Sequence, residues 1–270
     1  MNSKFLKRVV YAACCAVVIA SCTTTPSGRS QLILKSEAAL ELEGARQFNI
    51  IRETVPLVNN RDTIDYVACV ANAIVDELDG PAADMYWELA IVDQPDVNAY
   101  VLPGGKIVVK AGLLSVTANQ DQLAAVIGHE VAHVTSHHSN ERASRAAVTG
   151  FGIDVAAILL GGPYGRNTNA AYGALSTGVM FGLSNPFSRK QESEADLIGL
   201  EYMAMAGFDP RQSVELWKNM NAANTSRIPE FLSTHPSGDT RIDDLVSHYA
   251  KTLALYNQAQ AEGKYPDCRR

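Results

Sequence analysis

The chain has 270 residues, 47% of them hydrophobic, with 23 basic and 29 acidic side chains and a net charge of -6. This acidic balance argues against nucleic acid as a partner, because phosphate binding needs clustered Lys and Arg, and no such run follows Arg8. The length suffices for one domain with a substantial core, and no internal repeat is visible.

Residues 1–21 are similar to a bacterial secretory leader. Three basic residues precede an apolar run that is too short for a comfortable transmembrane helix (Lys4, Lys7 and Arg8, then 9–20). The sequence Ile19-Ala20-Ser21-Cys22 resembles a lipobox, in which a peptidase cuts before a Cys that then carries lipid. We therefore expect Cys22 to be a lipidated N-terminus. An uncleaved anchor and an ordinary export signal are the alternatives.

A lipid on Cys22 would attach the protein to a membrane, and the residues that follow it would connect this anchor to the domain. Removing the leader would leave 20 basic and 29 acidic residues, a net charge of -9. Residues 22–35 are rich in Thr, Ser and Gly at their start, which predicts a flexible tether. No Asp follows Cys22, and by the enterobacterial sorting rule this predicts the outer membrane of the bacterial cell envelope, with the protein facing the periplasm.

The next part of the chain predicts two helices and a small sheet. Apolar residues recur at three- and four-residue intervals in 36–53 and 63–78, the period of an amphipathic helix. A strand is predicted at 87–92, followed by a hairpin with arms at 97–102 and 107–109.

A long helix is predicted over 121–139, and it contains the most informative motif of the chain, His129-Glu130-Val131-Ala132-His133. Residues four apart share one face of a helix, so both imidazoles can reach one ion while Glu130 leans toward a water on it. This spacing predicts a catalytic site with one Zn2+ per chain.

The second half of the chain predicts mostly helices. Residues 146–160 are interpreted as a buried helix, and the glycine-rich residues 161–187 as a mobile cover over the site; the apolar stretch among them is too short to span a bilayer. Three more helices follow, at 189–206, 210–220 and 239–261. These elements predict one domain over 36–261 and a C-terminal tail at 262–270.

A catalytic zinc site usually has three protein ligands, so a third donor is needed. The metzincin pattern is excluded, because Ser139 stands where its third His would be and Ser136 where its Gly would be. His137 lies one turn beyond His133, but three ligands in line on a straight helix cannot converge on one ion. We interpret His137 and His138 as surface residues or as outer partners of the ligands.

Glu192 is the better third ligand. Glu192 and Asp196 share one face of the predicted helix, whereas Glu194 points roughly opposite. Asp196 is then placed to accept the outer N-H of a ligating His and to fix its tautomer. The alternative for Asp196 is a surface ion pair, because acidic helix faces are common.

With Cys22 lipidated and the leader removed, only Cys69 and Cys268 can pair with each other. An exported compartment permits a disulfide that would staple the tail to an early helix. The apolar helical surroundings of Cys69 suit a buried thiol equally well.

The chain resembles the M48 family of zinc metallopeptidases over most of residues 95–245. The resemblance rests on the strand at 98–105, the metal helix at 128–134, the element from Glu192 to Asp196, and Thr234-His235-Pro236 with Arg241. It implies that Glu192 is the third ligand and that His235 approaches the metal. Taken alone, the His-Pro pair is a turn; with the resemblance, His235 would stabilise an oxyanion or occupy the open metal position.

The predicted helices and small sheet indicate an α+β fold that is mainly α. This is similar to a gluzincin-type minimal metallopeptidase domain, with a small antiparallel sheet and the His-Glu-x-x-His helix. The lipobox and the lack of convincing membrane-spanning helices make the chain similar to the exported members of the family, the periplasmic outer-membrane quality-control peptidases.

These features predict a zinc-dependent endopeptidase that degrades misfolded or misassembled envelope and outer-membrane proteins. A zinc-activated water would attack the scissile carbonyl with Glu130 as general base, and the strand at 98–102 would hold unfolded substrate as an added strand. Outer-membrane assembly machinery is a further expected partner. The alternatives are a chaperone-like outer-membrane assembly factor with a largely latent zinc site, and a structural envelope lipoprotein whose motif is accidental.

Overall fold

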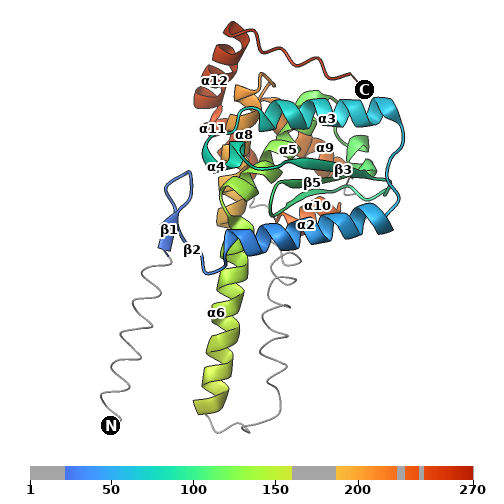
Figure 1. The fold of residues 1–270 in the computed structure, drawn as a ribbon. Helices are drawn as coiled ribbons and strands as arrows, with labels where there is room; N and C mark the ends of the chain where they lie inside the picture. Colours follow the sequence, from blue (N-terminus) through green and yellow to red (C-terminus); the bar gives the residue numbers. More distant parts are fainter. Residues whose placement is uncertain (1–21, 160–186, 224–228, 237–239, 270) are drawn as a thin grey trace. The chain divides into compact units, whose positions relative to one another are not determined.

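The computed structural model describes residues 22–159, 187–223, 229–236 and 240–269 (Figure 1). The expected leader at 1–21 lies outside these residues, and so does the expected cover at 161–187 apart from Phe187. Contacts divide the chain into a larger unit (37–138 and 186–270) and a smaller unit (1–36 and 139–185), which are described separately.

Helices make up most of the larger unit. Asn60, Asn119 and Ser188 each accept a hydrogen bond from a backbone N-H in the first turn of a helix, and so fix where α3, α5 and α8 begin. The helices are α2 (Glu37–Thr54), α3 (Arg61–Val75), α4 (Gly80–Ala83), α5 (Gln120–Thr135), α8 (Arg189–Met205), α9 (Gln212–Ala223), α10 (Glu230–Thr234), α11 (Arg241–Ser247) and α12 (Tyr249–Ala261), with a 3-10 turn, η1, at Ala111–Ser115.

The helices expected at 36–53, 63–78 and 189–206 are confirmed as α2, α3 and α8. The helix expected at 239–261 is instead two helices, α11 and α12, which meet at His248. There, the Ser247 hydroxyl and His248 Nδ1 lie 2.7 and 3.1 Å from the carbonyl oxygen of Asp244. Side chains that bind a carbonyl in this way compete with the helical hydrogen bonds and end the helix.

The sheet of the larger unit has three strands, β3 (Glu88–Val92), β4 (Ala99–Leu102) and β5 (Lys106–Lys110), in the order β3-β5-β4. The hairpin of β4 and β5 is antiparallel, as expected, whereas β3 runs parallel to β5. The α+β, mainly α fold is confirmed. The sheet is mixed, which corrects the expected antiparallel arrangement: β3 pairs with β5, beyond the intervening β4, through a crossover.

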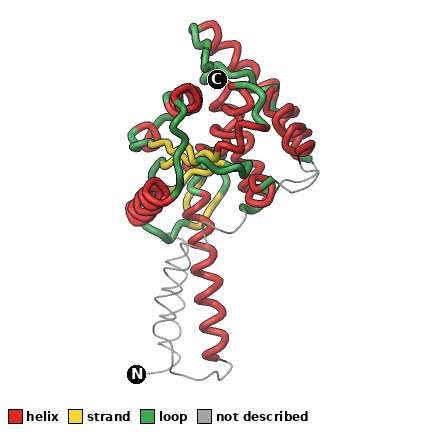
Figure 2. The backbone as a smooth tube through the Cα atoms, turned by 90° about the vertical axis from the view of Figure 1, so that its right-hand side faces the viewer, coloured by secondary structure: helices red, strands yellow, loops and turns green. Residues whose placement is uncertain are grey.

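Helices cover the sheet and form the core with it. α3 packs against β3, α2 against β4 and β5, and α5 against β4; in Figure 1 the strands lie between α3 and α2. Figure 2 shows helices on either side of the strands. Val67, Val70 and Ile74 of α3, with Leu123 and Ile127 of α5, are at most 1% exposed. This spacing of three and four residues gives each helix a continuous buried stripe.

The helices α5 and α8 meet backbone to backbone at two glycines. A Cβ atom on Gly199 would lie 2.6 Å from the backbone nitrogen of His129, and one on Gly128 would lie 2.7 Å from the carbonyl oxygen of Gly199. Ordinary contacts of a Cβ atom begin at 3.4 Å. The two glycines therefore set how closely α8 approaches α5 beside His129.

The C-terminal tail is fixed to the larger unit. Cys69 and Cys268 form a disulfide, with their Cα atoms 5.6 Å apart, so the disulfide alternative holds and the free buried thiol does not. Gln120, the first residue of α5, donates to the carbonyl oxygen of Pro266 at 2.7 Å and accepts from the backbone N-H of Cys268 at 2.8 Å. The tail is thereby attached both to α3 and to the start of α5.

The smaller unit contains a hairpin and a helix. β1 (Cys22–Thr24) and β2 (Ser30–Leu32) pair antiparallel where the sequence predicted a flexible tether, because Gly28, at φ 84°, closes the turn between them. α6 (His138–Leu159), which belongs to this unit from Ser139 on, covers residues 146–159 of the helix expected at 146–160; residue 160 lies outside the described residues. The guanidinium of Arg29 donates to both carboxylate oxygens of Glu141 at 2.9 and 2.8 Å, which joins the hairpin to α6. Within the ranges that the structure describes, no helix is both long and apolar enough to cross a membrane.

Candidate metal centre

Helix α5 carries three polar side chains in a buried position. His129, Glu130 and His133 are at most 3% exposed. The one-turn spacing places His129 Nε2 and His133 Nε2 3.0 Å apart. Both imidazoles therefore turn the same ring nitrogen toward one point, as the sequence predicted for two ligands.

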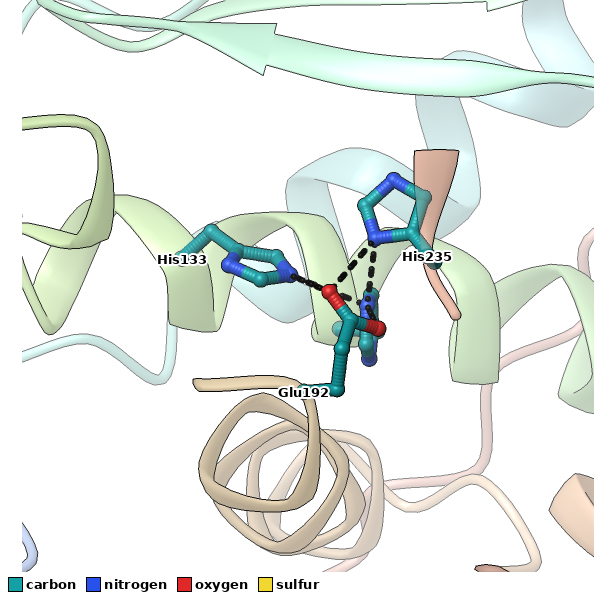
Figure 3. Close-up of side chains that lie close together, drawn as sticks. His133, Glu192 and His235 are labelled. Carbon is teal, nitrogen blue, oxygen red and sulfur yellow. Dashed lines mark hydrogen bonds and ion pairs between the residues drawn. The ribbon is translucent and has the colours of Figure 1, made fainter. Parts of the chain in front are cut away.

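Glu192 from α8 and His235 from the end of α10 complete the group, and Figure 3 shows His133, Glu192 and His235 pointing toward one another. Glu192 Oε2 lies 3.4 Å from His129 Nε2, and Glu192 Oε1 lies 3.5 Å from His133 Nε2. His235 Nδ1 lies 3.1 Å from both His129 Nε2 and Glu192 Oε1. One candidate ligand atom from each of the four residues lies within 4.8 Å of all the others.

These separations fit a small tetrahedral ion. Ligand atoms about 2.0–2.1 Å from a tetrahedral Zn2+ lie roughly 3.3–3.4 Å from one another. The pairs measured between the four side chains range from 3.0 to 3.5 Å. Three imidazole nitrogens and a carboxylate are also donors that zinc accepts, so the residues present fit the metal.

The electrostatics of the group favour a cation. Burial opposes ionisation of Glu192, but its bonds with three imidazoles hold its pKa well below the usual range. Burial alone would lower the pKa of His129, whereas its hydrogen bonds with Asp196 and Glu192 raise it to about 9. Burial lowers the pKa of His133 well below its ordinary value, which keeps a ring nitrogen available as a ligand.

Glu130 lies between His235 and the edge of the sheet. Its Oε1 atom is 3.3 Å from His235 Nε2, and the backbone N-H of Val101 in β4 lies near its carboxylate. Burial raises the pKa of Glu130, although nearby His235 and His129 oppose this. A carboxylate with a raised pKa is suited to take up and return a proton near neutral pH.

Asp196 supports His129 from the outer side of its ring. His129 Nδ1 lies 2.9 Å from Asp196 Oδ1, so this nitrogen donates its proton while Nε2 faces the other ligands. Arg241 donates to Asp196 Oδ1 at 2.6 Å and to Glu192 Oε2 at 3.3 Å, and its guanidinium lies 3.6 Å from the ring centroid of Trp217. Arg241 thus holds two carboxylates of the centre in fixed positions.

The two His after the motif lie in different surroundings. α5 ends at Thr135, which corrects the helix expected over 121–139: Ser136 is its C-cap, and His137 adopts φ 53°. The His137 side chain is 44% exposed and lies 3.2 Å from a carboxylate oxygen of Glu37. His138 is fully buried, and its Nδ1 atom is 2.8 Å from His133 Nδ1.

Three further side chains of the centre could not be assigned from the sequence. Glu194 is buried and bonds His138, although its helix position suggested that it points away. Phe187 stacks on His133, with ring centroids 3.8 Å apart, and precedes α8. Arg241 could be recognised in the sequence only as part of an element that resembles the family. The available signal is that Glu194 is a third acidic residue beside Glu192 and Asp196 on this helix, and a carboxylate that becomes buried requires a partner.

The fold and the donor set are those of the His-Glu-x-x-His metallopeptidase class in which the third ligand is a glutamate. The chain belongs to peptidase family M48, whose model matches residues 62–248. Membership implies a bound metal, typically zinc.

Curated proteins similar to this chain are themselves named as proteases. The chain is 41% identical over 189 residues to the mitochondrial metalloendopeptidase OMA1 of Schizosaccharomyces pombe, covering 69% of this chain and 51% of that protein. Identity to the OMA1 protein of Saccharomyces cerevisiae is 34%, covering 64% and 50%. Identity to the beta-barrel assembly-enhancing protease of Escherichia coli is 28%, covering 78% and 47%. The chain therefore spans about half the length of the curated relatives it matches.

Proposed function

We propose that this protein is a zinc-dependent endopeptidase. The observation that carries the proposal is the convergence of His129, His133 and Glu192 on one point beside the buried carboxylate of Glu130. When bound, zinc would supply a Lewis acid that polarises a peptide carbonyl and makes water more acidic. His129, His133 and Glu192 would hold one Zn2+ per chain.

Glu130 is the proposed general base and acid. Its raised pKa allows it to take a proton from the attacking water and to return that proton to the leaving amine. Asp196 acts through His129, whose ring it orients, and does not itself touch substrate.

The free edge of β4 is the proposed substrate platform. Within the described part of the chain, β4 pairs only with β5, and the bond from Lys110 N to Asn98 O fixes which residues face that partner. Backbone groups alternate between the two sides of a strand, so those of Ala99 and Val101 face the open edge. An extended peptide added there would run past Glu130 and be recognised through its main chain.

The first experiment compares wild type with Glu130→Gln in the full chain. The amide preserves size but cannot accept the proton, so cleavage of casein should fall at least about 100-fold while one zinc per chain remains bound. The exposed Glu53→Gln variant should cleave like wild type. Retained cleavage by Glu130→Gln would exclude the mechanism, and zinc-free protein after purification in zinc-containing buffer would exclude the metal.

We further propose that His235 closes the site in the state described. Its Nδ1 atom lies among the proposed ligands and its Nε2 atom lies beside Glu130, where water and substrate have to enter. His235→Ala should therefore raise casein cleavage several-fold, and adding Glu130→Gln should abolish it. A loss of cleavage in His235→Ala would instead assign His235 to oxyanion stabilisation.

The proposed substrates are misfolded or misassembled proteins of the bacterial envelope and outer membrane, reached from a lipid anchor at Cys22. The supports are the lipobox-like sequence and the likeness to a relative named beta-barrel assembly-enhancing protease. Cys22→Ser should release the protein from the membrane fraction and remove metabolically incorporated palmitate. Envelope proteins should co-purify with Glu130→Gln from cells; recovery of cytoplasmic proteins alone would contradict this assignment.

A second candidate function is a chaperone-like outer-membrane assembly factor with a largely latent zinc site. The closed position of His235 favours it. Complementation of a deletion strain by Glu130→Gln separates the two: full rescue supports the assembly role, and no rescue supports proteolysis.

A further inference from the structure

The outer nitrogen of His133 faces a second buried pair, His138 and Glu194. His133 Nδ1 lies 2.8 Å from His138 Nδ1, and His138 Nε2 lies 3.0 Å from Glu194 Oε2. We propose that His138 and Glu194 are positioning residues that fix the tautomer and the ring orientation of His133 for zinc. The inference rests on the proposed zinc site but not on peptide cleavage.

When His133 binds metal through Nε2, only one arrangement of protons satisfies the hydrogen bonds from His133 to His138 and from His138 to Glu194. A neutral imidazole that ligates through one nitrogen carries its proton on the other, so His133 Nδ1-H is a donor. Nδ1 of His138 must then be the acceptor, which places the His138 proton on Nε2. That proton points to Glu194, whose carboxylate can only accept.

The backbone between the two imidazoles is bent to make this contact. Five residues of a continuous helix turn through roughly 500°, which would put His138 about 140° away from the face of His133. The helix instead ends at Thr135, and His137 adopts φ 53°, the one positive φ among the described residues that are not glycine. A left-handed conformation at a non-glycine residue costs free energy, and here it returns His138 to His133.

Burial prevents water from replacing either partner in the hydrogen bonds from His133 to His138 and from His138 to Glu194. The side chains of His138 and Glu194 are 0% and 5% exposed. The amide of Gln191 donates to the carbonyl oxygen of His138 at 3.3 Å, and Phe187 stacks on His133. Water is thus a poor substitute for the acceptor, and loss of His138 Nδ1 would leave a buried N-H on a metal ligand.

The two metal-facing imidazoles of α5 therefore have different supports. His129 is held directly by the carboxylate of Asp196, which Arg241 fixes. His133 is held by a neutral imidazole whose carboxylate lies one residue further out. Both supporting carboxylates come from α8, so the same helix that supplies Glu192 orients both His ligands.

The test measures Zn2+ affinity of the full chain by competition with a chromophoric chelator. His138→Leu removes the acceptor and should weaken zinc binding by about 10- to 100-fold. His138→Asn keeps an acceptor oxygen near the position of Nδ1 and should stay within about threefold of wild type. Likewise, Glu194→Gln can still accept from His138 and should bind more tightly than Glu194→Leu. His137→Asn, which tolerates the left-handed conformation, is the matched control and should bind like wild type.

Thermal unfolding of each variant without metal distinguishes a folding defect from a positioning effect. A direct measurement does not depend on any variant: histidine nitrogen shifts of the zinc-loaded wild type should give Nδ1-H for His133 and Nε2-H for His138. The opposite tautomer of His138, or a folded His138→Leu variant with unchanged zinc affinity, would refute the proposal that His138 and Glu194 position His133. Wild type that binds no zinc would refute the proposed metal site instead.

Discussion

Replacing Gly199 by Ala tests whether the close approach of α5 and α8 sets the metal centre. In an isolated helix this change stabilises, because Ala has a helix propensity about 1 kcal/mol better than Gly. Here the new Cβ would lie 2.6 Å from the backbone nitrogen of His129, short of the 3.4 Å at which ordinary contacts begin. The helices have to separate by the difference, about 0.8 Å. Overpacking of this kind costs about 1–3 kcal/mol.

We expect the clash to exceed the gain in propensity, for a net destabilisation of about 1 kcal/mol in urea unfolding of the metal-free protein. Because Gly199 lies seven residues after Glu192 on one rigid helix, the same displacement moves that ligand away from His129 and His133. Displacements near 1 Å at a reacting centre cost about 100-fold in rate, so casein cleavage should fall by that order.

The control for this experiment is Ser193→Ala, an exposed substitution on the same helix, which should leave zinc affinity unchanged. Chelator competition and urea unfolding are measured on both variants. The reasoning fails if Gly199→Ala stabilises the protein as propensity alone predicts, or if it binds zinc and cleaves casein like wild type.

Three other predictions follow from contacts described above. Replacing Cys69 and Cys268 together by Ser opens a loop with a sequence separation of 199 residues, worth about 5 kcal/mol of unfolded-chain entropy, and a loss below about 1 kcal/mol in urea unfolding would contradict this. Burial opposes ionisation of Glu141, but hydrogen bonds from Arg29 and Arg145 lower its pKa below 4.5. The stabilisation by this carboxylate is therefore present above pH 4.5 and is lost as the pH falls through the folded pKa. Protection of β1 and β2 from hydrogen exchange should fall on acidification in wild type and show no such step in Glu141→Gln. Arg241→Lys keeps the charge but loses the two-atom contact with Asp196 and the ring stack, and should weaken zinc binding about 10-fold in chelator competition; equal affinity would show that the geometry of the guanidinium is unimportant.

The sequence predicted the candidate site best where both residues of a pair lie on one helix. His129 and His133 lie one turn apart on α5, and Glu192 and Asp196 one turn apart on α8, so helical periodicity alone predicts which side chains share a face. The family could be predicted from these residues together with the strand at 98–105 and the element around His235, and the mainly α fold from the periodicity of the predicted helices. The approach of α5 to α8 could not, because it depends on two glycines that carry no chemical signal.

Other parts of the centre depend on backbone geometry that periodicity does not encode. The contact of His138 with His133 requires α5 to end at Thr135, and propensity gave no reason to expect a left-handed His137. Strand order is a second case: β3 pairs with β5 and not with its neighbour in sequence, β4, and a strand pattern does not specify its partner.

The backbone N-H of Val101 lies on the open edge of β4, and it lowers the pKa of Glu130 against the larger opposing effect of burial. In the proposed substrate complex, a peptide that extends the sheet beside Val101 would accept a hydrogen bond from this N-H. The carboxylate would then lose the influence of this N-H, which would raise its pKa further and make it a stronger base. Occupation of the sheet edge and activation of the base would then be a single event.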